Sequence, residues 1–151
     1  MAKKKMNGAG TDLPWFIRSE TLVELVWKGD PAIKKGGFPE DYVEVGAAPK
    51  ALIEFKHGKE PTVFDTRSMG REEQILLYGV MAQSHMEGDS AKQFVFLMDE
   101  AAKRCVEKVT LPDGKTFSKA MWEKHYKNMF GTLAACIGQF VIKETHKDPL
   151  S

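Results

Sequence analysis

This chain lacks an excess of either positive or negative charge. Its 22 lysines and arginines stand against 21 aspartates and glutamates, so the formal net charge is +1. Bulk charge therefore predicts neither a nucleic-acid ligand nor an anionic membrane surface. The sequence has no apolar run near the ~18 residues that a membrane span requires. Its first residues, MAKKKMNGAGTDLPW, contain no apolar signal segment. We therefore expect a soluble, cytoplasmic protein.

Cysteine is scarce. The two cysteines, Cys105 and Cys136, both fall on the apolar stripes of predicted helices, so we expect buried free thiols rather than a disulfide. Neither a Cys-x-x-Cys pair nor a His-x-x-x-His pair occurs among the two cysteines and four histidines. Zinc sites typically show such local spacing. The sequence therefore predicts no metal and no cofactor.

Motifs that carry out reactions are absent or incomplete. No Gly-x-Ser-x-Gly elbow occurs, and the Gly-Lys-Thr at 114–116 lacks the glycine that a phosphate loop needs five positions earlier, where Val109 stands. The acidic pairs 72–73 and 99–100 have simpler explanations, as a first helical turn and as a polar helix face. We therefore expect that the protein is not an enzyme.

Apolar residues at three- and four-residue spacing predict three long helices, at residues 71–86, 91–109 and about 119–143. The most regular stripe lies in SAKQFVFLMDEAAKRCVEKV, residues 90–109. It raises the question of whether these side chains serve the protein's own core or a partner. The residues predicted to form the core are Leu76, Val80, Phe94, Leu97, Met98, Ala101, Cys105, Trp122, Met129, Leu133 and Ile137.

Small side chains mark the last predicted helix. Ser118 is a suitable N-cap for it. Gly131, Ala134, Ala135 and Gly138 lie near one another along it. An interior glycine costs a helix about 1 kcal/mol, so we expect that another helix approaches closely here.

Two further elements complete the predicted fold. Apolar residues followed by Gly29 predict a short helix at 19–28. ALIEF and TVF, on either side of a turn at Gly58, predict a β-hairpin near 51–64. The fold class predicted from these elements is mainly α (α+β). It is a helical bundle of three longer helices plus a short N-terminal helix, with the small hairpin packed against it.

The chain is predicted to hold one domain. Residues 1–12 read as a flexible basic arm and residues 13–151 as a single globular helical domain. The arm and the Gly- and Pro-rich segment at 29–42 are the expected contact segments, so a chain lacking residues 1–12 should fold but assemble less well. The residues predicted to bind a partner are Lys3, Lys4, Lys5, Trp15, Phe16, Lys34, Lys35 and Phe38.

A second cluster supports an alternative function. Cations interleaved with aromatic side chains are typical of proteins that hold single-stranded nucleic acid. The aromatic residues of this cluster also lie on the apolar stripe of the last helix, so packing in the core is the stronger interpretation. The cluster consists of Lys115, Lys119, Trp122, Lys124, Tyr126 and Lys127.

The middle of the chain resembles a class of small phage-encoded proteins. The matching pieces are IEFKHGKEPTVFD and LLYGVMAQSHMEGDS, within about residues 51–110. The resemblance implies a phage setting, in the host cell or the virion, where such proteins are commonly virion parts, assembly factors or inhibitors of host machinery. We therefore expect a non-enzymatic structural or assembly accessory protein that binds protein partners, either itself or other phage proteins. The alternatives are a single-strand nucleic-acid binder and an inhibitor of a host enzyme or defence system.

Overall fold

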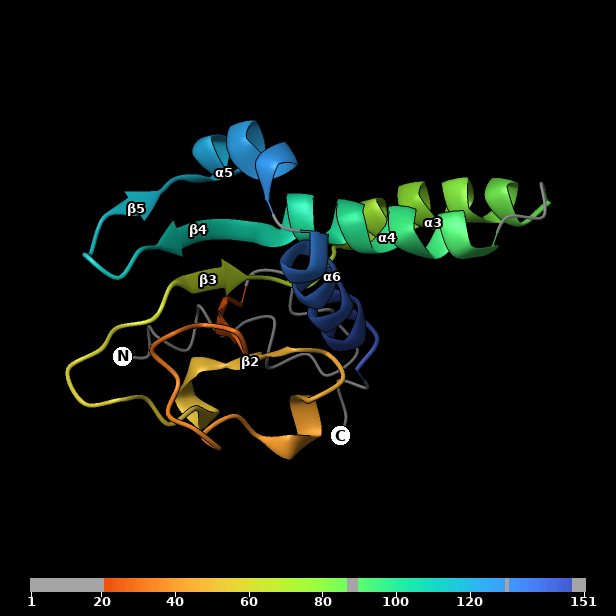
Figure 1. The fold of residues 1–151 in the computed structure, drawn as a ribbon. Coiled ribbons are helices and arrows are strands. Elements are labelled where there is room, and N and C mark those ends of the chain that lie inside the picture. Colours follow the sequence, from red (N-terminus) through yellow and green to blue (C-terminus); the bar gives the residue numbers. More distant parts are fainter. Residues whose placement is uncertain (1–20, 87–89, 130, 148–151) are drawn as a thin grey trace, which may run out of the picture.

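The computed structural model describes residues 21–86, 90–129 and 131–147 (Figure 1). The described strands form one antiparallel sheet with the order β2-β1-β3-β4-β5. These strands are β1 (Val23–Trp27), β2 (Ala47–Pro49), β3 (Val63–Thr66), β4 (Val106–Thr110) and β5 (Thr116–Phe117). The helices are α3 (Arg71–Met86), α4 (Ser90–Cys105), α5 (Lys119–His125) and α6 (Gly131–Thr145). Three short 3-10 turns are η1 (Glu40–Tyr42), η2 (Lys50–Leu52) and η3 (Tyr126–Asn128).

This sheet shows that the predicted helical bundle is wrong. The fold is α+β, and five strands rather than one hairpin form its centre. Helix α3 was predicted with its observed bounds. The other predicted elements are each changed by pairing or packing with a distant part of the chain.

The predicted helix at 19–28 is wrong, because Val23–Trp27 is a strand that pairs with β2 on one side and β3 on the other. Leu25 packs into the main core beneath the helices, and Val26 packs into a smaller core on the opposite face of the sheet. A strand that is buried on both faces is apolar at consecutive positions. The alternation that distinguishes a strand from a helix is therefore missing here.

The predicted hairpin at 51–64 is also wrong. Its second half does form a strand, β3, but that strand pairs with β1 and β4 rather than with ALIEF. Within ALIEF, Phe55 forms an isolated bridge with Ile33. Both residues pack against the smaller core of Val26, Ala48, Ile53 and Val63.

The predicted helix at 91–109 ends early, at Cys105, and the chain continues directly as β4. Phe64 pairs with Val109, but Thr66 pairs with Val106, so one extra residue, Glu107, lies between the paired positions. This irregularity lets both valines reach the main core although they are three residues apart. Spacing of three fits a helix equally well, which explains the error.

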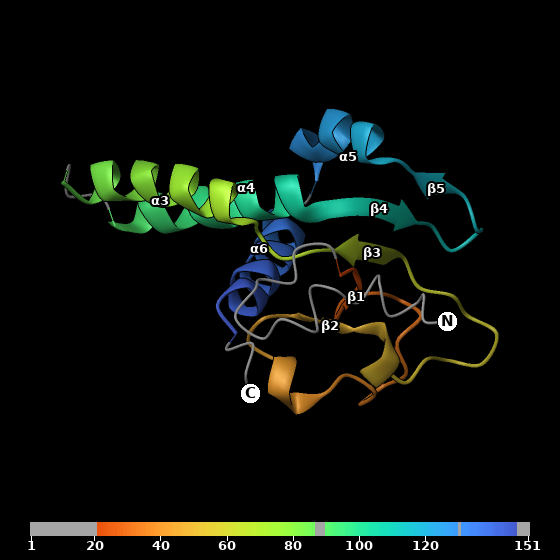
Figure 2. The same ribbon diagram turned by 180° about the vertical axis from the view of Figure 1, so that it is seen from behind.

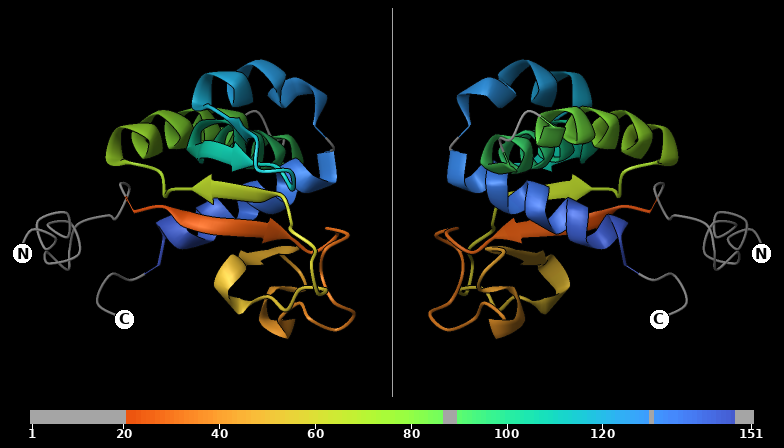
Figure 3. Two further views of the ribbon diagram at one scale, coloured as in Figure 1. Left: turned by 90° about the vertical axis from the view of Figure 1, so that its left-hand side faces the viewer. Right: turned by 90° about the vertical axis from the view of Figure 1, so that its right-hand side faces the viewer.

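The predicted helix at 119–143 is two helices, α5 and α6, separated by η3. Helix α5 packs against β4, whereas α6 packs against α4 and runs alongside β1 (Figure 3). The predicted N-cap is confirmed, because the Ser118 hydroxyl accepts a hydrogen bond from the Met121 amide at 3.3 Å.

The expected close approach of two helices is confirmed at Gly138. A Cβ atom placed on this residue would lie 2.1 Å from the carbonyl oxygen of Met98 in α4. No side chain larger than hydrogen fits at that distance. Gly131, by contrast, has nothing within 4 Å of such an atom.

The predicted core is largely confirmed. Leu97, Met98, Ala101, Cys105, Trp122, Leu133 and Ile137 are buried, and Met129 is partly buried against them. Leu76 and Phe94 were predicted wrongly, since they are 51% and 49% exposed. The side chain of Val80 lies outside the described part of the chain. Both cysteines are free and buried, as expected.

Candidate functional site

The residues predicted to bind a partner do not form one described surface. Lys3, Lys4, Lys5, Trp15 and Phe16, with the whole arm at 1–12, lie outside the described residues. Lys34 and Lys35 are exposed, and Phe38 is partly buried against the smaller core.

The segment at 29–42 around these residues is a structured connection. The Asp30 carboxylate accepts hydrogen bonds from the backbone amides of Ala32 and Thr62, each at 2.9 Å. Gly37 packs against the backbone of Glu54, since a Cβ there would lie 2.6 Å from its carbonyl oxygen. The segment therefore covers one face of the sheet.

The aromatic residues of the basic cluster are buried. Trp122 is 3% exposed, and its indole N–H donates to the carbonyl oxygens of Ala102 and Lys103, each at 3.2 Å. Tyr126 is 7% exposed and donates its hydroxyl proton to the Asp99 carboxylate at 2.6 Å. Burial, together with that hydrogen bond, raises the pKa of Tyr126 well above its usual value. Packing in the core is thus confirmed for both rings.

The cations of this cluster are spread out. Lys115, Lys124 and Lys127 are exposed. Lys119 forms an ion pair with Glu107 at 3.0 Å, and its ammonium also donates to the carbonyl oxygen of Arg104. One of the four lysines of this cluster is therefore part of the fold rather than available to a ligand.

The guanidinium of Arg67 makes an extensive set of polar contacts that no sequence pattern predicted. It donates to both carboxylate oxygens of Glu73, at 2.7 and 2.9 Å, and to Glu107 at 2.8 Å. Its two remaining protons go to the carbonyl oxygens of Ser68, at 3.0 Å, and Arg104, at 3.1 Å. All five donors of an arginine are therefore used.

The charges around Arg67 stabilise one another. The hydrogen bond from Arg67 is the main cause that lowers the pKa of Glu73, although burial opposes it. At Glu107 burial alone would raise the pKa, but hydrogen bonds from Arg67 and Lys119 hold it below its usual value. These ionised groups join the ends of β3 and α4, the starts of α3 and α5, and the irregularity in β4. Their arrangement is that of a structural junction.

No cluster among the described residues has the geometry of a metal site, since no three His, Cys, Asp or Glu side chains there converge on one point. The thiol of Cys105, next to the junction, is buried, and burial raises its pKa to about 12. A thiol with that pKa is protonated at neutral pH and is a poor nucleophile or metal ligand.

Two helices extend beyond the rest of the structure. Helices α3 and α4 pack side by side and project past the sheet and past α6 (Figures 1 and 2). We call this helix pair the α3–α4 arm. It is held at its base by the Arg67 junction and by contact of the Tyr78 ring with His146, whose ring centroids are 5.6 Å apart. The arm is therefore fixed relative to the sheet.

The stripe of α4 divides where α6 stops covering it. Leu97, Met98 and Ala101 lie in the main core, and the backbone of Met98 is where α6 comes closest. One turn nearer the tip, Phe94 is 49% exposed and Val95 is 59% exposed. The stripe thus serves the protein's own core along one half and faces solvent along the other.

Helix α3 adds two more exposed apolar side chains to the arm. Ile75 is 62% exposed and Leu76 is 51% exposed. Elsewhere in the described chain, large exposed apolar residues are scattered over separate elements, at Leu22, Val43, Leu52 and Met121. Single apolar residues are normal on a protein surface, but a concentration of them indicates an interaction site. The arm is therefore the candidate functional site.

The structure contains no helix, within its described residues, that combines the length and apolarity needed to cross a bilayer. A scan against protein-family models finds no match, and comparisons with curated proteins and with solved structures find none either. The resemblance to phage-encoded proteins therefore remains a prediction, and any functional proposal must rest on the geometry of this chain alone.

Proposed function

We propose that this protein is a non-enzymatic structural or assembly accessory that acts through protein–protein contacts, and that the α3–α4 arm pairs with the arm of a second copy. The observation that carries the proposal is the exposure of Ile75, Leu76, Phe94 and Val95 on one projecting helix pair. Two such pairs laid side by side give the four-helix packing that commonly buries apolar helix faces. The phage setting is kept as an implication of the resemblance only.

A second copy is favoured by the amount of apolar side chain that the arm exposes. Complete burial of an aliphatic or aromatic side chain contributes about 1.5–3 kcal/mol, so each half-exposed residue contributes roughly half of that. Against a partner surface without apolar residues, the four side chains supply about 3–6 kcal/mol, which does not clearly exceed an association cost that begins near 4 kcal/mol. A symmetric dimer buries these four residues of both copies and supplies about 6–12 kcal/mol. Contributions of about 8–12 kcal/mol exceed a cost near 4 kcal/mol by about 4–8 kcal/mol, which corresponds to a dissociation constant in the micromolar to millimolar range.

The sedimentation of the purified chain tests this proposal over a concentration series. We expect a monomer–dimer equilibrium that Ile75→Glu combined with Val95→Glu abolishes, because two buried carboxylates in each copy would face an apolar surface. The matched control is Leu52→Glu, which changes a residue of similar exposure, 54%, on η2. The control should dimerise like the unchanged chain, and all variants should keep the same far-ultraviolet circular dichroism.

Two results contradict the proposal. One is a chain that remains monomeric at millimolar concentration. The other is a dimer that survives the double substitution in the arm, because the contact surface must then lie elsewhere.

A further inference from the structure

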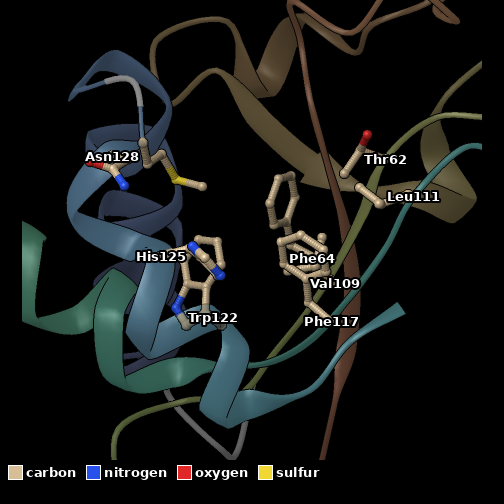
Figure 4. Close-up of a pocket in the computed structure, with 9 residues that line it drawn as sticks. Thr62, Phe64, Val109, Leu111, Phe117, Trp122, His125 and Asn128 are labelled. Atoms are coloured by element: carbon tan, nitrogen blue, oxygen red, sulfur yellow. The ribbon is translucent and has the colours of Figure 1, made fainter. Parts of the chain in front are cut away.

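A hollow of about 250 Å³ lies on another part of the molecule, between the sheet and the α5–η3 segment (Figure 4). Phe64 and Val109 supply the sheet side, and Trp122 and Met129 supply the opposite wall. Phe117 closes one end from β5. The hollow is thus built from three strands and the segment that follows them, and it shares no residue with the α3–α4 arm.

Aromatic rings line this hollow from several sides. Phe64 and Trp122 meet edge to face, with ring centroids 5.9 Å apart and an interplanar angle of 69°. Phe117 and the imidazole of His125 are 6.1 Å apart at 43°. Rings inclined in this way offer both faces and edges to a further ring that packs against them in the hollow. The walls therefore suit a planar aromatic molecule.

Polar groups occur only at the margin. His125 and Asn128, from α5 and η3, line one side, and Thr62 lies on the other (Figure 4). In the part of the chain that the structure describes, no side-chain hydrogen bond is made by these three residues, while the Thr62 backbone amide donates to Asp30. Uncommitted donors and acceptors beside an apolar surface can fix the orientation of a ligand.

The size of the hollow limits the ligand. An apolar cavity of about 150 Å³ is enough for benzene, and sites for larger ligands begin near 300 Å³. A volume of about 250 Å³ lies between them and fits one fused or substituted ring system. Among the described residues that line the hollow there is no carboxylate, lysine or arginine. We propose that the hollow is a binding site for a small, uncharged, planar aromatic molecule that carries one hydrogen-bonding group.

Three matched compounds test the two parts of this proposal. 2-Naphthol has a fused ring and a hydroxyl, naphthalene has only the ring, and decahydro-2-naphthol keeps the hydroxyl on a saturated, puckered frame. Titrations of the full chain are followed by amide chemical shifts in nuclear magnetic resonance spectra. 2-Naphthol should saturate with a dissociation constant below about 1 mM, and the shifts should centre on Val109, Phe117 and Trp122. The saturated compound should bind at least tenfold more weakly.

Variants locate the site and its hydrogen bond. Leu111→Trp adds bulk to a partly exposed lining residue, so it should fill the hollow and weaken 2-naphthol binding more than tenfold. His125→Phe, which keeps the lining ring, or Asn128→Ala should weaken 2-naphthol about threefold to tenfold, the effect of one neutral hydrogen bond, and should leave naphthalene unchanged. Met121→Ala, on α5 but outside the hollow, is the matched control.

The proposal is overturned if 2-naphthol shows no saturable shifts, or if Leu111→Trp, with an unchanged fold, binds it as before. Equal affinity for the saturated compound overturns the requirement for an aromatic ring. A dimer that forms through the arm is unaffected by any of these outcomes, so the two proposals fail separately.

Discussion

Replacement of Gly138 by alanine tests the packing on which the orientation of the α3–α4 arm depends. The new Cβ atom would lie 2.1 Å from the Met98 carbonyl oxygen, 2.7 Å from its carbonyl carbon and 2.9 Å from its Cα. Ordinary contacts begin at 3.4 Å, so the two backbones must separate by about 1.3 Å, the difference between 3.4 and 2.1. Backbone atoms on both sides cannot turn away as a flexible side chain can.

The cost follows from the contacts that this separation loosens. Gaps of 0.5–1 Å already forfeit a quarter to a half of a dispersion contact, and overpacked cores typically lose 1–3 kcal/mol or more. Alanine recovers about 1 kcal/mol through its higher helix propensity. A backbone separation of about 1.3 Å places the packing loss at the upper end of that range, about 3 kcal/mol. We therefore expect Gly138→Ala to lower the free energy of unfolding by a net of about 2 kcal/mol, or the melting temperature by roughly 4–8 °C at this chain length.

Gly79→Ala provides a control of opposite sign. Gly79 lies within α3, is exposed, and has nothing within 4 Å of an added Cβ. Only the propensity gain applies, so this variant should be more stable than the unchanged chain by up to about 1 kcal/mol. Urea unfolding followed by circular dichroism measures both variants. The reasoning is refuted if Gly138→Ala is as stable as the unchanged chain, since α4 and α6 would then accommodate a Cβ atom at this contact.

Three further predictions concern the Arg67 junction and the thiol beside it. Arg67→Lys keeps the charge, but a lysine ammonium has too few N–H donors for the five hydrogen bonds that Arg67 makes. The free energy of unfolding, measured by urea unfolding, should therefore fall by about 2 kcal/mol. Equal stability would contradict the role of the junction. The lowered pKa of Glu73 means that its contribution to stability is complete above the unfolded-state pKa near 4.3 and is lost as pH falls through the folded-state pKa. Glu73→Gln should therefore reduce the loss of stability below about pH 4.3 in acid titrations, and an unchanged slope would count against it. Cys105, with its pKa raised to about 12, should react with iodoacetamide only after unfolding, and rapid labelling in native buffer would show that it is accessible.

The helical half of the fold could be predicted from the sequence because its packing is local. The spacing of apolar residues correctly indicated α3 and the buried half of α4, and Ser118 and Gly138 marked a helix start and a helix contact. Each of these signals lies within a few turns of the residues that it positions. The burial of Leu97 and Met98 follows in the same way.

The sheet could not be predicted because its signals depend on distant partners. Consecutive burial of Leu25 and Val26 requires covers on both faces, and only residues far along the chain supply them. The extra residue at Glu107 gives a strand the spacing of a helix. It also directs that carboxylate to Arg67, so the feature that hid β4 from the sequence pattern also completes the junction.

The candidate site was only half visible in the sequence. The length of the stripe on α4 raised the question of a partner, but the point where α6 stops covering it is a property of the assembled fold. Phe94 continues the spacing of the core residues and was therefore predicted to be buried. A clue was available in the density of large apolar residues at 75–76 and 94–97, which exceeds what two short helices can bury between them.

The order of strands in the sheet sets a condition on how the chain can assemble. Strand β1 lies between β2 and β3, and β3 also pairs with β4. The paired positions of β3 and β4 are 40 to 47 residues apart in the chain, from Thr66–Val106 to Val63–Thr110. The chain between these strands must close into a loop before their hydrogen bonds form, and the entropy cost of closing it slows folding. During synthesis the ribosome must release the chain beyond residue 110 before the middle strand gains its second neighbour. Until then the nascent β1 and β3 present an unpaired strand edge that can pair with another chain and aggregate. Chaperone binding should therefore matter most at this stage of synthesis.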